Sequence, residues 1–175
     1  ATVQEQAARH LELVGLADRA AAPAGTPIEV SVLRENGGVR LSTGVLVPEA
    51  DGGLGMGHVE AGIVLEEIGR NLTPSPFLTS SVMAATALSA AGDEARGRWL
   101  PGLVSGDSVF AVAIDEGPKH RPERIATKAE RSGNGFKLSG KKDFVLYGAS
   151  ADMIVVAART SGSDTDEHGI TLFAV

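Results

Sequence analysis

The sequence has no cysteine, few aromatic residues and no long apolar run. Without cysteine there are no disulfide bonds, thiolate metal ligands or cysteine nucleophile, and a cytoplasmic protein is the simplest expectation. Aromatic residues make up only 4% of the chain, so close helix packing and tight glycine turns should replace a large aromatic core. No stretch reaches the roughly 18–20 apolar residues of a membrane helix, so we expect no membrane partner.

Charge is not gathered into blocks of one sign. The 16 basic and 22 acidic residues give a net charge of −6 over 175 residues, which argues against a nucleic-acid partner. The four histidines, His10, His58, His120 and His168, offer no i, i+4 pair to a metal ion, so we expect no metal site. With 43% hydrophobic residues, the composition is typical of a globular chain that buries a core.

Helical spacing of apolar residues dominates the first part of the chain. Thr2 and Glu5 form a capping-box start and predict a helix through about Ala20. Residues 21–27 hold two prolines and a glycine, which indicate a connection. Residues 28–35 predict a second helix, ended by a glycine pair.

Three further helices follow a glycine-rich loop. Residues 58–72 show a clear amphipathic pattern, and residues 80–91 are apolar around most of the helix circumference, which predicts a nearly buried helix. Asp93 is a candidate cap for a short helix that closes at Gly102–Gly106. Up to about residue 106, the sequence therefore predicts a helical domain.

From Asp107 the pattern becomes extended. Strands are predicted at residues 109–114, 125–131, 136–138, 144–147, 153–158 and 170–175, with a hairpin turn at Gly133-Asn134-Gly135. A run of helices before a run of strands predicts an α+β multidomain protein. We expect an amino-terminal all-α helical bundle (1–106), followed by a small, partial, antiparallel β-barrel-like central domain (107–175).

Two motifs are candidates for phosphate binding. The glycines at positions 52, 53, 55 and 57 lack the spacing of a dinucleotide fingerprint and the lysine of a phosphate loop, so a tight structural turn is favoured over a phosphate cradle. Lys119, His120, Arg121, Arg124 and Lys128 form a basic patch that meets ligand phosphates or, as is favoured on charge alone, lies in solvent. The residues alone indicate no catalytic constellation.

From about Gly44 onward the sequence resembles the acyl-CoA dehydrogenase family. The loop Val45–Gly55 resembles the Val-Pro-Glu-x-x-Gly-Gly-x-Gly loop of that family, and further matches follow in family order. They are Leu65–Arg70, Arg98–Gly106, Leu138–Lys142, Ala151–Arg159 and Gly169–Val175. Residues 21–43 fit the family poorly.

The resemblance implies an FAD-dependent enzyme of lipid metabolism that oxidises acyl-CoA thioesters to the α,β-enoyl form. In that family a glutamate removes the α-proton and the flavin accepts the β-hydride. The resemblance places this base in a carboxy-terminal helical domain that this chain lacks, so we expect no catalytic residue here and an incomplete catalyst. It also implies an acyl-CoA substrate, an electron-transfer acceptor protein and a homo- or hetero-oligomer, for which Val59 and Ile63 offer apolar surface.

The family's two flavin-contacting stretches match Val112, Ile114 and Asp115 in the first and Phe144, Val145 and Leu146 in the second. Asp115 stands where the family usually has threonine or serine, and its carboxylate would oppose the negative charge of a reduced flavin. Leu146 offers no hydroxyl to the ring. Two interpretations follow: a dehydrogenase subunit with an atypical flavin site, or a flavin-poor subunit with a binding or structural role in a heteromeric complex.

Overall fold

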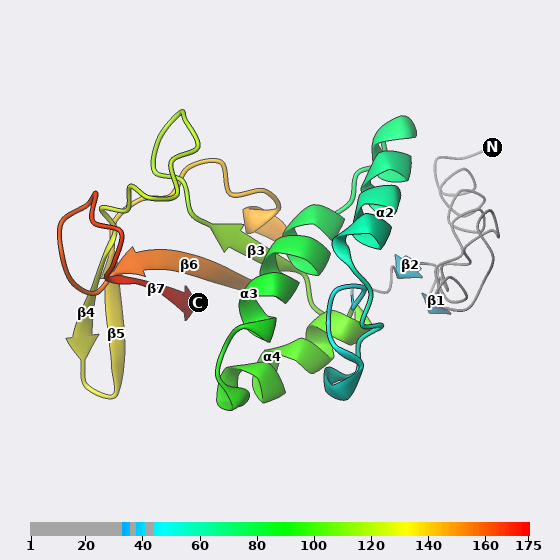
Figure 1. Ribbon diagram of the computed structural model, residues 1–175, viewed down its shortest axis with the longest axis horizontal. Helices are drawn as coiled ribbons and strands as arrows, with labels where there is room; N and C mark the ends of the chain where they lie inside the picture. Colours follow the sequence, from blue (N-terminus) through cyan, green and yellow to red (C-terminus); the bar gives the residue numbers. More distant parts are fainter. Residues whose placement is uncertain (1–32, 36–37, 41–43) are drawn as a thin grey trace. The chain divides into compact units, whose positions relative to one another are not determined.

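The computed structural model describes residues 33–35, 38–40 and 44–175, which belong to two compact units that divide between Ser108 and Val109 (Figure 1). The helix predicted through Ala20 and the connection at residues 21–27 lie outside the described residues. The domain limits 1–106 and 107–175 remain a prediction, and each unit is described by itself below.

The first unit contains a hairpin where a helix was expected. Strand β1 (Leu33–Glu35) pairs antiparallel with β2 (Gly38–Arg40). The predicted helix over residues 28–35 is therefore wrong for residues 33–35. The physical reason lies in Asn36-Gly37, the residue pair most typical of two-residue hairpin turns, which stands between the two strands in the sequence. With this hairpin, an all-α bundle is not confirmed.

Helices and their connecting loops form residues 44–108 of the first unit. After the short turn η1 (Glu49–Asp51), helix α2 (His58–Arg70) confirms the clearest predicted helix. The side chain of Glu60 accepts the Gly57 N–H at 2.9 Å at its start, and Leu72, at φ +50°, lies beyond its end. The predicted buried helix consists of a π-helical segment, η2 (Leu78–Ala84), that continues into α3 (Ala85–Ser89).

The last helix of this unit, α4 (Asp93–Ser105), continues through Pro101 and ends at a left-handed Gly106, within the predicted closure at Gly102–Gly106. Gly92, and not Asp93, occupies its N-cap position, so the predicted aspartate cap is wrong. One core cluster is formed by Val45, Ala61, Val64 and Phe77. Partly buried side chains, Ile63 among them, pack against this cluster.

The second unit is a five-stranded mixed sheet. Its strands are β3 (Phe110–Ala113), β4 (Lys128–Ser132), β5 (Gly135–Ser139), β6 (Met153–Arg159) and β7 (Ile170–Ala174). They follow the order β3-β6-β4-β5, and β7 also pairs with β6. The β4–β5 and β6–β7 pairs are antiparallel, but β3–β6 and β4–β6 are parallel. The expected antiparallel barrel-like domain is therefore corrected to a mixed sheet.

The segment 144–147, predicted as a strand, is a turn. Phe144 and Tyr147 have φ values of +54° and +57°, which a strand cannot include. The Gly148 N–H donates to the Val145 carbonyl at 3.1 Å, and the short helix η3 (Gly148–Ser150) follows. Aromatic and β-branched residues thus favoured a strand that the local backbone excludes.

Arg159, the last residue of β6, is a buried cation with 5% of its surface exposed. Its guanidinium donates to the carbonyls of Ile125 at 2.8 Å, His168 at 2.9 Å and Asp166 at 3.2 Å. These bonds tie the β6–β7 connection to the chain before β4. Among the described helices, none has the length and apolar character needed to span a bilayer.

Candidate functional site

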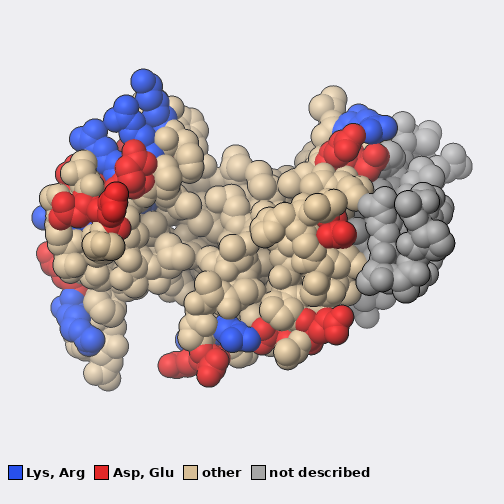
Figure 2. All heavy atoms as spheres, viewed as in Figure 1, with Lys and Arg blue, Asp and Glu red and all other residues tan. Residues whose placement is uncertain are grey.

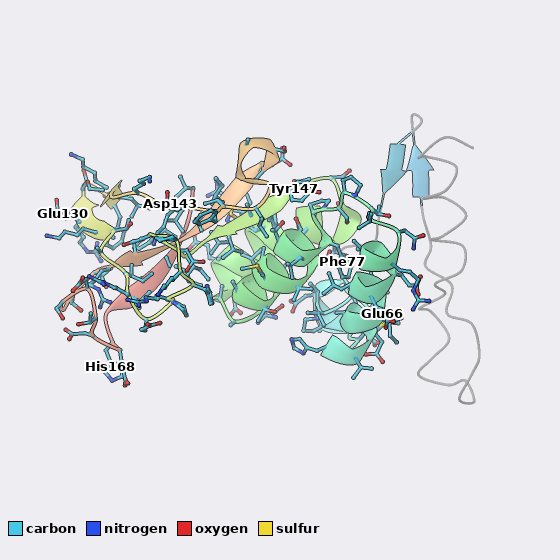
Figure 3. The ribbon with its side chains drawn as sticks, turned by 90° about the horizontal axis from the view of Figure 1, so that it is seen from above. Glu66, Phe77, Glu130, Asp143, Tyr147 and His168 are labelled. Carbon is cyan, nitrogen blue, oxygen red and sulfur yellow. The ribbon has the colours of Figure 1, made fainter. Side chains whose placement is uncertain are left out.

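In the second unit, the residues directly before the second matched segment (144–147) bond to the end of the first matched segment. The Asp143 N–H donates to the Asp115 carbonyl at 2.8 Å, and the Lys142 ammonium donates to the Ile114 carbonyl at 2.9 Å. Figure 3 labels Tyr147 in the second segment and Asp143 directly before it. The chain between β5 and η3 therefore runs along the end of β3.

A buried ion pair holds this junction. The Lys142 Nζ lies 2.7 Å from Glu116 Oε1, and their side chains are only 9% and 15% exposed. Glu116 also accepts the backbone N–H groups of Ala126 at 2.7 Å and Thr127 at 2.9 Å. Burial by itself raises the pKa of Glu116, but the hydrogen bonds from Lys142, Thr127 and Ala126 outweigh it and lower the pKa to about 2.

Asp115 is turned toward a histidine. Its carboxylate lies 3.0 Å from His120 Nδ1 and accepts the Arg121 N–H at 3.1 Å. The hydrogen bond with His120 lowers the pKa of Asp115, burial opposes this, and the Arg121 N–H lowers it further. The carboxylate is thus ionised, and its hydrogen bonds are made within its own loop, to His120 and Arg121.

The predicted contact residues differ in exposure. Val112 lies within β3 opposite Val155 of β6, and Ile114 and Val145 are half-buried. Phe144 is 74% exposed and Leu146 is 54% exposed, because the turn at residues 144–147 directs them outward. Tyr147, at 38%, is also exposed.

Sequence reasoning assigned no role to Glu116 or Lys142, which position both segments. For Lys142 the sequence does offer one indication, the glycine at position 140. A side chain at Gly140 would overlap Thr127, and the Thr127 N–H donates to Glu116. The chain must therefore pass close to Thr127 before it reaches Lys142. Glu116 carries no comparable local signal.

The glycine-rich loop of the first unit is a tight turn, as favoured. A side chain at Gly53 would overlap the Val47 carbonyl. The N–H groups of residues 52–56 all donate to carbonyls within the loop or its flanks, so none of them is available to cradle a phosphate. Arg96 of α4 fixes the loop through Asp51, at 2.6 and 2.7 Å from its two carboxylate oxygens.

Helices followed by a small mixed sheet, with a strand end set beside an apolar turn, place the chain in the α+β class. The family model for the acyl-CoA dehydrogenase N-terminal domain matches residues 3–107, which is more than half of the chain. The chain belongs to the acyl-CoA dehydrogenase family.

Among curated relatives, the acyl-CoA dehydrogenase FadE27 of Mycobacterium tuberculosis is 38% identical over 118 residues, which cover 65% of this chain and 30% of that protein. The chain thus spans about a third of the length of such relatives. The ChsE4-ChsE5 complex from Mycobacterium tuberculosis matches with a TM-score of 0.64 at 26% identity, over 76% of this chain and 35% of that one.

A glutaryl-CoA dehydrogenase from Mycobacterium smegmatis, solved in complex with FADH2, has a TM-score of 0.63 at 24% identity. This match covers 77% of this chain and 34% of that chain. At 24% identity this match is evidence only that the two chains share a fold.

Proposed function

We propose that this chain is part of an FAD-dependent acyl-CoA dehydrogenase, which converts an acyl-CoA thioester to its α,β-enoyl form. The observation that carries this proposal is that Lys142 and Asp143, directly before the second matched segment, bond to Ile114 and Asp115 of the first. Family membership and the FADH2 complex of a protein with this fold support it.

The residues present fit a flavin ring through shape and backbone more than through polar side chains. Phe144 and Leu146 expose an apolar surface suited to a flat aromatic ring. Asp115 is the unfavourable element, because a carboxylate disfavours negative charge nearby. Its contacts with His120 and the Arg121 N–H offset part of that cost.

When bound, FAD supplies the acceptor for the hydride that leaves the β-carbon of the thioester. The residues of this chain would orient the flavin ring and shield it from water. The Glu116–Lys142 pair holds the chain before residue 144 against the end of β3, and the exposed Phe144 and Leu146 would offer apolar contact to a bound ring. We propose that a cytoplasmic acceptor protein removes the electrons.

A second candidate function has a specific observation in its favour. Asp115 and Leu146 stand where the family provides hydroxyl groups, and neither side chain offers a hydroxyl donor. In this alternative the chain is a flavin-poor subunit with a binding or structural role in a heteromeric complex. The neighbour ChsE4-ChsE5 is itself a complex of two named components.

The visible absorption spectrum separates the two candidates. The purified full chain, incubated with FAD and desalted, should retain flavin absorption bands if it is a dehydrogenase subunit. The F144A variant should weaken FAD binding about tenfold, since it removes a stacked ring worth roughly 1–1.5 kcal/mol. The matched control L72A, which removes an 88% exposed apolar side chain from the first unit, should leave FAD binding unchanged.

A desalted protein without flavin bands would favour the structural subunit. Activity is the further test for the first candidate. An acyl-CoA substrate with an artificial electron acceptor should yield the enoyl thioester only in the presence of FAD.

A further inference from the structure

We propose that His120 is a positioning residue that acts through Asp115 and makes the charge beside the flavin site depend on pH. The Nδ1 atom of His120 lies 3.1 and 3.0 Å from the two carboxylate oxygens of Asp115. The Arg121 N–H donates to the same carboxylate at 3.1 Å and helps to hold it in place. This role rests on the proposed function, because a bound flavin ring is the group on which the charge acts.

The contact determines which ring nitrogen of His120 carries the proton. An ionised carboxylate only accepts hydrogen bonds, so the Nδ1 atom that faces Asp115 is the donor when the imidazole is neutral. No hydrogen bond joins Nε2 to any residue that the structure describes, and the His120 side chain is 69% exposed. Nε2 is therefore the atom at which the imidazole exchanges a proton with solvent.

The other charged groups next to Asp115 are already paired. Lys142, which also lowers the pKa of Asp115, lies 2.7 Å from Glu116. Asp143, whose N–H donates to the Asp115 carbonyl, lies 2.6 Å from Lys141. These two ion pairs leave the imidazole as the counter-charge of Asp115 that changes near neutral pH.

The rest of the connection between β3 and β4 gives a constant background of charge. Figure 2 shows Lys and Arg atoms gathered over this connection. Its remaining charged residues are Lys119, Arg121, Glu123 and Arg124, and Arg124 lies 3.5 Å from Asp164. Lysine, arginine and the carboxylates keep their charge between about pH 5.5 and 8.5. Their effect on a bound ring therefore changes little over this range.

Protonation of His120 changes the net charge of the pair by one unit. At the acidic end of the range, an imidazolium balances the Asp115 carboxylate. At the alkaline end the carboxylate charge remains, and it disfavours negative charge on a neighbouring ring. Because reduction adds negative charge to the flavin, the site should favour reduced flavin more strongly at low pH than at high pH.

Midpoint potentials of the FAD-loaded full chain test this role. The H120Q variant can still donate a hydrogen bond to Asp115 but stays neutral at every pH. At about pH 8.5 the potentials of wild type and H120Q should agree. At about pH 5.5 wild type should bind reduced flavin roughly fivefold better relative to oxidised flavin, the size of an exposed ion pair, which corresponds to a potential about 20 mV higher. H168Q removes another exposed histidine of the second unit, labelled in Figure 3, and should match wild type at both pH values.

The D115N variant shows whether His120 acts through Asp115. Without the carboxylate, the further change H120Q should alter the relative affinity for reduced flavin by less than about twofold, or about 9 mV, at either pH. A carbon NMR titration of the flavin-free protein gives a readout that does not need the cofactor. Because the hydrogen bond with His120 is the largest cause that lowers the pKa of Asp115, H120A should raise that pKa and H168Q should leave it unchanged.

The possible failures are distinguishable. If FAD is retained but wild type and H120Q differ equally at both pH values, or if H120A leaves the pKa of Asp115 unchanged, the role of His120 is refuted and the dehydrogenase proposal stands. A full chain that retains no FAD at either pH would refute the dehydrogenase proposal, and the role of His120 toward the flavin with it.

Discussion

At the scale of single residues, Glu116 and Lys142 join parts of the chain that are 26 positions apart. The Glu116 carboxylate accepts three hydrogen bonds, two of them from the backbone before β4. Lys142 donates a second hydrogen bond to the Ile114 carbonyl. Removal of one partner leaves a buried charge unpaired. We therefore expect that removal to lower the free energy of unfolding by more than the net attraction of the pair contributes.

We expect the E116Q variant to lower the free energy of unfolding by about 3 kcal/mol, since a pKa lowered from 4.5 to about 2 corresponds to that stabilisation of the ionised form. Urea unfolding followed by circular dichroism measures it. E130Q, an exposed glutamate on β4, is the control and should change stability by less than about 0.5 kcal/mol. The double variant E116Q/K142M should lose less than the sum of the single variants, and simple additivity would argue against the coupling.

The same residue predicts a pH dependence with a definite sign. Since the pKa of Glu116 is lowered by folding, its stabilisation is complete above about pH 4.5 and is lost as the pH falls toward about 2. Between pH 6 and pH 3 the wild type should therefore lose about 2 kcal/mol more unfolding free energy than E116Q. Parallel urea titrations at the two pH values measure the difference, and equal losses would contradict it.

At the scale of elements, the sequence predicted well those segments whose burial pattern is regular. Helix α2 and strand β6 have clear periodicity or a clear apolar run, and both were placed within about two residues, the usual uncertainty of element ends. Residues 144–147 failed because β propensity reports side-chain preference, while the positive φ values of Phe144 and Tyr147 are set by the surrounding structure.

The candidate site was predicted only in part for a related reason. The resemblance supplied Ile114, Asp115 and Phe144, but Glu116 and Lys142, which join these parts of the chain, lie 26 positions from each other, and nothing local in the sequence indicates that they pair. The parallel pairing of β3 with β6 is likewise not encoded by either strand alone, since the alternation of side chains is the same in both kinds of sheet.

The loop before α2 makes an element-scale prediction. G53A should destabilise the protein by about 2 kcal/mol or more, because the added methyl group overlaps the Val47 carbonyl and forces the turn apart. G62A, on α2, has open space at its Cβ position and should be neutral or stabilising by up to about 1 kcal/mol, because alanine is the better helix former. Thermal unfolding of both variants measures the contrast; similar midpoints would refute the steric argument.

At the scale of the whole molecule, only one of the two apolar residues of α2 that we expected at an oligomer interface is exposed. Val59 is 71% exposed, whereas Ile63 packs against the core cluster. We expect the protein to be an oligomer at micromolar concentration, and V59E to lower its mass in light scattering because a buried charge at an interface is costly. E66Q, at another exposed position of α2, should leave the mass unchanged, and a wild-type monomer would count against the prediction.

The parallel partnership of β3 and β6 has a consequence for synthesis. Val109 and Asp152, which bond at the start of the two strands, are 43 residues apart. At roughly 5–20 residues per second, a ribosome needs about two to nine seconds to deliver β6 after β3 has been made. During that interval the apolar residues Phe110 and Ala111 have no native neighbour strand, so the nascent chain passes through a stage at which chaperone binding would protect it from aggregation.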